Sequence, residues 1–230
     1  MRPTQTSLAA FTFALALALS ACNSTPQDPE FSDSDVIMDR LHLVTNARVG
    51  MAYVDPDVDL ADFNSIMIDT LDLSNVEVVQ PNNNSVSTAR RTTWELTDRD
   101  RESLQNAFKE VFERELAETG DYGVVSEVGP NVLRLSAAIT QIAPSATRDD
   151  GRSRHVGRTR VYTEGAGNMT MAFALSDSQT GEVFAIVKDT RSGSPVWGLN
   201  NSVSNMGDVR FMFNRWARML RARMDIAHGY

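Results

Sequence analysis

Five arginines between residues 148 and 160 give the sequence its strongest candidate for binding chemistry. They are Arg148, Arg152, Arg154, Arg158 and Arg160. A guanidinium can bind a phosphate or a carboxylate through two parallel N–H donors. The segment is therefore a candidate loop for lipid phosphates, peptidoglycan stem peptides or an acidic protein face. In the alternative that we favour, these arginines pair with acidic residues of the same domain.

The histidines do not form a recognisable catalytic or metal-binding motif. His42, His155 and His228 are far apart, and none has a partner at the His-x-x-x-His spacing. His155 or the pair Asp149 and Asp150 can still meet a serine in space, because catalytic triads are defined by geometry and not by chain order. A hydrolase with a site around residues 148–160 is thus the alternative to the non-enzymatic protein that we expect, without cofactor or metal.

A cluster of aspartates raises the question of a calcium site, because hard cations prefer several carboxylate oxygens. The cluster consists of Asp55, Asp57, Asp59 and Asp62. It lacks the glycine at the sixth position and the closing glutamate of an EF-hand loop. We therefore expect a solvated acidic turn.

The single cysteine, Cys22, follows an N-terminal segment with the layout of an export signal. Arg2 precedes an apolar run over residues 8–19, which is shorter than the roughly 20 residues of a membrane-spanning helix. A lone thiol cannot form an intramolecular disulfide and would leave an exported chain with a reactive group. Lipid attachment to Cys22 is the interpretation that removes this difficulty; ordinary cleavage near Ala18 or Ser20 is the alternative.

The residues before the cysteine, Leu19-Ser20-Ala21, resemble the lipobox of bacterial lipoproteins. This resemblance implies that Cys22 becomes the first residue and carries two or three acyl chains, which hold a protein firmly at a membrane. Asn23 stands where lipoproteins kept in the inner membrane tend to have aspartate. The resemblance therefore implies the periplasmic face of the outer membrane.

The chain after the signal contains enough apolar residues for one folded domain. The sequence has 230 residues, 42% of them hydrophobic, and a formal net charge of −8, which disfavours nucleic acid as a partner. Residues 23–45 are polar, and no strand pattern is convincing there. We predict a signal peptide over 1–21, a lipidated flexible tether over 22–45 and a single α+β periplasmic domain over 46–230.

Hydrophobic periodicity locates the main elements of that domain. Thr97 can cap a helix with an apolar stripe that ends at Gly120, which we expect to be left-handed, and a last helix begins at Asp208. Alternation predicts a strand over 132–143 and a hairpin of residues 168–177 with 182–190. The order of elements indicates an α+β fold: a mainly antiparallel sheet of about five strands with two helices packed on one face.

With these pieces, the chain resembles the uncharacterised bacterial lipoprotein family called domain of unknown function 3313. The matching stretches are the lipobox at Cys22, Tyr53 to Asp69, Gly129 to Leu135, the turn from Asp177 to Glu182, and Trp216-Ala217. The resemblance implies location and fold but no mechanism. The turn is also similar to one in the curli secretion lipoprotein, so a curli-type secretion component is a weaker alternative.

These observations together predict a membrane-anchored periplasmic lipoprotein that acts as a non-enzymatic binding or assembly module of the cell envelope. Its expected partners are the membrane, through lipid on Cys22, and an envelope protein, peptidoglycan or an anionic lipid. A homo-oligomer is compatible with the sequence.

Overall fold

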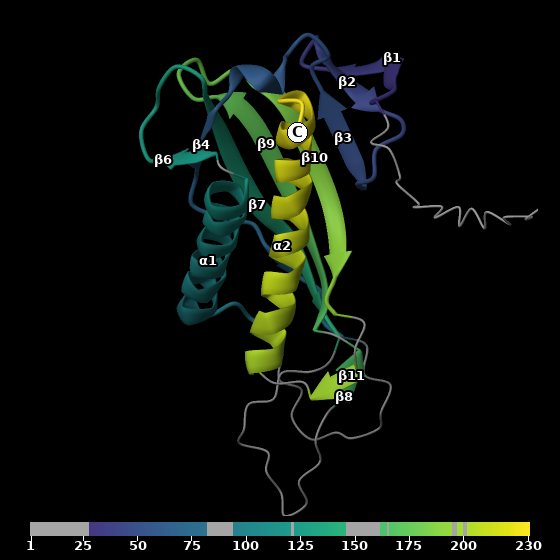
Figure 1. The fold of residues 1–230 in the computed structure, drawn as a ribbon. Helices are drawn as coiled ribbons and strands as arrows, with labels where there is room; N and C mark the ends of the chain where they lie inside the picture. The colour runs from purple at the N-terminus through teal and green to yellow at the C-terminus, as the bar shows by residue number, and fades with distance from the viewer. Residues whose placement is uncertain are drawn as a thin grey trace, which may run out of the picture.

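A nine-stranded mixed sheet forms one layer of the molecule, and two helices form a second layer on one of its faces (Figure 1). The computed structural model describes residues 28–81, 94–120, 122–145, 162–164, 166–194, 197–199 and 202–230. The predicted α+β class with two helices on one face is confirmed. The predicted sheet of about five strands is too small.

The strand order in the main sheet is β1-β2-β3-β10-β9-β7-β4-β6, with β5 beside β7. β4 pairs in parallel with both β6 and β7, β5 pairs in parallel with β7, and the other pairings are antiparallel. A separate two-stranded sheet contains β8 and β11. The bounds are Phe31–Ile37 (β1), Leu41–Val44 (β2), Met51–Val54 (β3), Ser65–Ile68 (β4), Glu77–Val78 (β5), Gly123–Val125 (β6), Val132–Pro144 (β7), Tyr162–Glu164 (β8), Gly167–Asp177 (β9), Val183–Ser192 (β10) and Trp197–Leu199 (β11).

The helices are α1, Asp98–Glu113, and α2, Ser202–Ala227, with a short 3-10 turn over Leu60–Asp62. α1 continues as a π-helix over Arg114–Thr119. Gly120, at its end, has a φ of −97°, so the predicted left-handed stop is wrong. The widened last turns end the helix instead, and the Tyr122 N–H donates to the Leu116 carbonyl at 3.0 Å.

The core lies between the two helices and the facing side of the sheet. On β7 the alternating residues Leu133, Leu135, Ala137 and Ile139 are all buried, as the pattern predicts. They meet buried side chains of both helices: Leu104, Ala107, Phe108, Val111 and Phe112 of α1, and Met212, Phe213, Trp216, Ala217 and Met224 of α2. The last helix is therefore a core helix on its inner face.

Two boundaries differ from the sequence-based prediction. Residues 31–44, placed in the flexible tether, form the antiparallel hairpin β1–β2 at one edge of the sheet. Three central residues of β1 are exposed polar residues, so this edge strand lacks the alternation that reveals a half-buried strand. α2 begins at Ser202 and not at Asp208, whose carboxylate accepts backbone N–H groups of Ala166 (2.7 Å) and Ser194 (3.1 Å).

The N-terminus of α1 has the predicted cap. The Thr97 hydroxyl accepts the Asp100 N–H at 3.2 Å, and the Asp100 carboxylate accepts the Thr97 N–H at 3.0 Å. Replacing Thr97 with alanine is expected to lower the free energy of unfolding by about 1 kcal/mol. Urea denaturation checks this value, with Thr97→Ser as the variant that keeps the cap; equal losses for both variants would contradict it.

Candidate functional site

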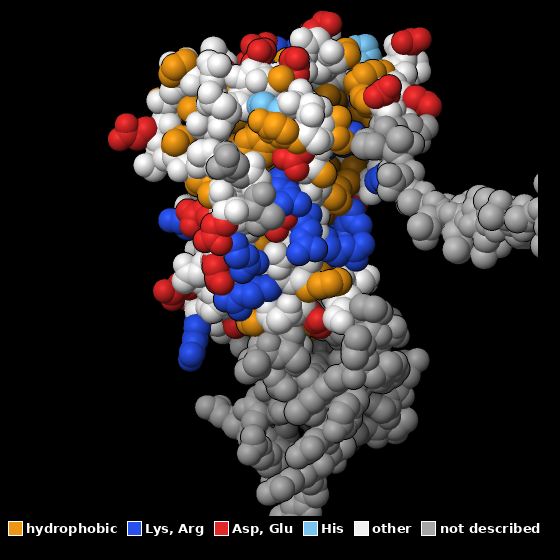
Figure 2. Space-filling model, viewed as in Figure 1, with side chains coloured by type: hydrophobic (Ala, Val, Ile, Leu, Met, Phe, Trp, Pro, Cys, Tyr) orange, Lys and Arg blue, Asp and Glu red, His pale blue; other side chains and the backbone are white. Residues whose placement is uncertain are grey.

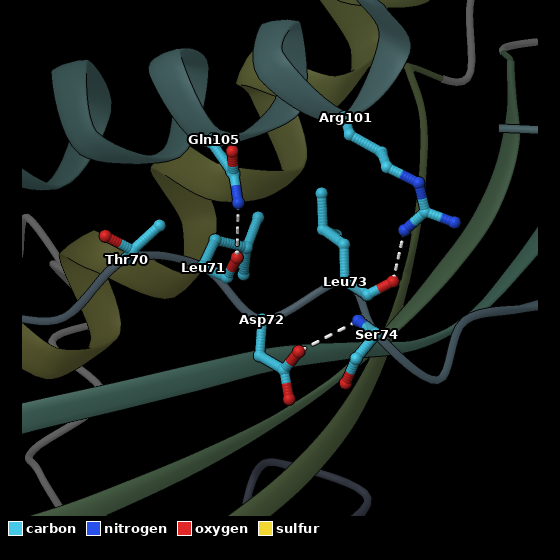
Figure 3. A pocket seen from close by; sticks show the side chains of 7 residues that line it. All are labelled: Thr70, Leu71, Asp72, Leu73, Ser74, Arg101 and Gln105. Carbon is cyan, nitrogen blue, oxygen red and sulfur yellow. Dashed lines mark hydrogen bonds between the residues drawn. The ribbon is translucent and has the colours of Figure 1, made fainter. Parts of the chain in front are cut away.

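A pocket of about 450 Å³ lies between α1 and the segment that follows β4 (Figure 3). The segment is held on the sheet because Asp72 forms a bridge with Ala138 of β7. The side chains that line the pocket come from this segment and from the first turns of α1: Thr70, Leu71, Asp72, Leu73, Ser74, Arg101 and Gln105. The pocket is an open depression of the surface, and we call it the Arg101 pocket.

Arg101 provides the positive charge of the pocket. One of its Nη atoms donates to the Leu73 carbonyl. Within the described part of the chain, no carboxylate lies within 4.0 Å of its guanidinium. A guanidinium has five N–H donors, so several remain for another acceptor. Gln105, one turn further along α1, donates to the Leu71 carbonyl at 3.1 Å and fixes the neighbouring wall.

Asp72 points away from Arg101: its exposed carboxylate lies on the side of the segment opposite to α1, while the buried Leu71 and Leu73 face the helix (Figure 3). Its carboxylate accepts the Ser74 N–H at 2.8 Å (Figure 3). Hydrogen bonds from the Ser74 hydroxyl and backbone lower the pKa of Asp72 below its ordinary value, so this carboxylate is ionised at neutral pH. On the side that faces α1, the pocket therefore presents the guanidinium of Arg101 and not the Asp72 carboxylate. A ligand that carries a carboxylate matches the free N–H donors of this guanidinium.

The two helices are joined by ion pairs at the surface. Arg210 of α2 contacts Glu110 at 3.0 Å, and the buried Glu115 lies 3.7 Å from Arg218 and 3.4 Å from Arg221. Figure 2 shows the resulting band of basic side chains over the helix layer, beside acidic ones. Among the described residues, these arginines of α2 pair with acids of α1 and of its π-helix continuation. The predicted pairing of the 148–160 arginines falls outside the described residues.

The outermost side of α2 is a second surface without an acidic residue. Successive turns place Phe211, Arg215, Arg218, Ala222 and Ile226 along it, and all five are exposed. We call these residues the α2 stripe. The guanidinium carbon of Arg215 lies 5.8 Å from the centre of the Phe211 ring. Sequence periodicity alone does not single out Phe211 and Ile226 as exposed residues of this helix.

Several residues singled out from the sequence cannot be placed. Cys22 and the candidate loop with Arg148, Arg152, Arg154, Arg158 and Arg160 lie outside the described residues, as do His155, Asp149 and Asp150.

The other two histidines are separate and bound to backbone. His42 Nδ1 is 3.1 Å from the Ser32 carbonyl, in the β1–β2 hairpin. His228 Nδ1 is 2.8 Å from the Met224 carbonyl, at the end of α2. Each pairing is a local contact within one structural unit.

The aspartate cluster has structural roles. Asp55 is buried and accepts the Asp57 N–H at 3.0 Å, while Asp59 accepts the Ala61 N–H at 2.9 Å and caps the 3-10 turn. The described residues contain no group of three or more His, Cys, Asp or Glu side chains placed to hold a metal ion. Nor does any described helix have the length and apolar character to cross a membrane.

The sequence of the chain matches a known protein family. The model of the family "Protein of unknown function (DUF3313)" matches residues 36–220. No curated protein matches the chain.

Three of the solved structures that are similar to this chain are described by their sequence identity, coverage and TM-score. The PelC dodecamer from Paraburkholderia phytofirmans is 14% identical, with 68% of this chain and 89% of that chain covered and a TM-score of 0.33. A putative lipoprotein from Caulobacter crescentus is 13% identical, with 67% and 92% covered and a TM-score of 0.33. A protein from Xanthomonas campestris is 12% identical, with 71% and 84% covered and a TM-score of 0.37. These scores are too low to say anything about function.

Proposed function

The chain belongs to the DUF3313 family of proteins of unknown function, and we propose that it is a membrane-anchored lipoprotein of the cell envelope with a non-enzymatic, ligand-binding domain. The proposed anchor is lipid on Cys22, and the proposed site of attachment is the periplasmic face of the outer membrane. The support for the anchor is the lipobox-like stretch Leu19-Ser20-Ala21 before the only cysteine. The resemblance to this family, read from the sequence, is confirmed.

The observation that carries the binding role is the guanidinium of Arg101 in the Arg101 pocket. Arg101 donates to the Leu73 carbonyl and keeps further N–H donors for an acceptor. A guanidinium binds a carboxylate through two parallel N–H donors. The best match is therefore a small carboxylate ligand, such as a short peptide with a free carboxyl end.

Arg101→Gln is expected to weaken the binding of a tripeptide with free ends about 10- to 100-fold, because a hydrogen bond to a charged group contributes about 1.5–3 kcal/mol. Isothermal titration calorimetry of the full mature chain measures this change. Tri-alanine is a suitable probe, compared with the same peptide acetylated at its amino end or amidated at its carboxyl end. The wild type and Arg101→Gln should bind the amidated peptide with equal affinity.

Arg99→Gln is the matched control, since Arg99 is an exposed arginine in the first turn of the same helix. Equal affinities of the wild type, Arg101→Gln and Arg99→Gln would contradict the proposed site. Mass spectrometry of the recovered peptide tests the alternative class: cleavage of the peptide by the wild-type chain would replace the binding role with hydrolysis.

A further inference from the structure

The α2 stripe combines basic and apolar side chains, and Arg218 is the member that also takes part in an ion pair of the helix layer. Phe211 is 41% exposed and Ile226 is 42% exposed, although both are large apolar residues. The side chain of Arg218 is 69% exposed. Arg215 has no carboxylate within 4.0 Å among the described residues. The opposite side of the same helix already fills the core, so the stripe is a separate surface.

Among the acidic groups near the stripe, the buried Glu115 lies 3.7 Å from Arg218 of the stripe, and two others have contacts elsewhere. Asp225 accepts the Tyr122 hydroxyl at 2.8 Å and lies 3.8 Å from Arg221. Glu110 pairs with Arg210 on the side toward α1. The stripe is therefore locally positive on a chain whose net charge is −8. Because charges are screened over about 10 Å at 0.1 M salt, a surface that approaches the stripe interacts mainly with these arginines and not with the whole protein.

The corrected length of the tether brings this surface close to a membrane. Six residue steps separate Cys22 from Asp28, where the described chain begins, and they span at most about 20 Å. Figure 1 shows that the strands β1 and β2, which follow Asp28, lie at the same end of the molecule as the C-terminus of α2. If Cys22 carries lipid, the end of the molecule that holds the C-terminus of α2 is therefore nearer to the bilayer than the opposite end.

We propose that the α2 stripe docks on anionic phospholipid headgroups, a conclusion that rests on the proposed lipid anchor only for its proximity to the bilayer. The arginines contact phosphate groups, and Phe211 and Ile226 enter the boundary between headgroups and acyl chains. A basic helix face with aromatic and aliphatic residues binds membranes in this way, and a single lipid anchor is strengthened by such a second contact. The arrangement holds the domain in one orientation, with the helix layer toward the membrane.

Vesicle co-sedimentation of the full mature chain with Cys22→Ser tests this proposal, because without a lipidated cysteine any binding reports the folded surface. The vesicles contain phosphatidylethanolamine with one quarter phosphatidylglycerol, and phosphatidylcholine vesicles serve as the neutral comparison. The proposal predicts binding to the anionic vesicles that weakens with added salt. Phe211→Ser together with Arg215→Gln should weaken it about 30-fold, because each basic residue near the surface and each buried aromatic contributes substantially.

Val128→Ser with Arg99→Gln is the matched control. It removes one exposed apolar residue, 61% exposed, and one exposed arginine away from the stripe. Circular dichroism confirms that both double variants fold. Equal binding by the two double variants, or equal binding to anionic and neutral vesicles, overturns the proposal and leaves the stripe as a protein-binding surface. The lipid state of wild-type Cys22 is measured separately, so failure of the anchor and failure of the stripe are distinguishable.

Discussion

Replacing Cys22 with serine is expected to release the protein almost completely from the membrane fraction. A serine offers no sulfur for the lipid, and each buried methylene of an acyl chain contributes about 0.8 kcal/mol of membrane affinity. The loss of two or three chains therefore changes the partition by many orders of magnitude. Fractionation of cells, followed by a high-salt wash that removes electrostatic contacts, measures the change.

Ser24→Ala is the control for this experiment, because it changes a neighbouring polar residue and keeps the cysteine. This variant should remain in the washed membrane fraction. A Cys22→Ser protein that stays in the same fraction after the wash would show that another part of the chain anchors it, and the proposed lipid tether would be wrong.

Asp189→Ala is expected to have the largest effect on stability among the described residues considered. Asp189 is 5% exposed and joins three parts of the fold. Its Oδ1 accepts the Gly50 N–H at 3.0 Å, and its Oδ2 accepts the Trp216 indole N–H at 2.9 Å and the Arg191 Nε–H at 2.5 Å. Removal of the Asp189 carboxylate leaves the mostly buried guanidinium of Arg191 and the indole N–H of Trp216 unpaired. The free energy of unfolding should therefore fall by about 3–5 kcal/mol.

Urea unfolding followed by tryptophan fluorescence checks this value, because Trp216 contacts the altered site directly. Asp57→Ala removes an exposed carboxylate and should change the free energy of unfolding by less than about 0.5 kcal/mol. Asp189→Asn keeps the shape of the side chain, and its loss in free energy of unfolding should lie between those of Asp189→Ala and Asp57→Ala. A loss for Asp189→Ala no larger than that of Asp57→Ala would show that this network does not hold β10 to α2.

The elements with strong local patterns were predictable from the sequence. β7 alternates between buried and half-buried residues, and α1 repeats its apolar residues on one face, because one side of each packs on the core. The β9–β10 hairpin was found from its turn. In each case the information lies within a stretch of about a dozen residues.

The rest depends on contacts that no local pattern records. The parallel pairing of β4 with β6 and β7 joins segments that are far apart in sequence, so local patterns do not reveal that part of the sheet is parallel. The hairpin β1–β2 has too many exposed polar residues to resemble a strand. The Arg101 pocket needs Arg101 of α1 to meet the Leu73 carbonyl across the α1–sheet boundary, and neither residue belongs to a motif. Only the fold brings them together.

The most direct test of the central claim, a membrane-anchored envelope lipoprotein, is the intact mass of the protein extracted from washed membranes with detergent, together with the mass of its N-terminal peptide. The account predicts a chain that lacks residues 1–21 and begins at Cys22, with a diacylglyceryl group on the sulfur and an acyl group on the new amino end. An unmodified cysteine, or a chain that begins at another residue, would contradict it.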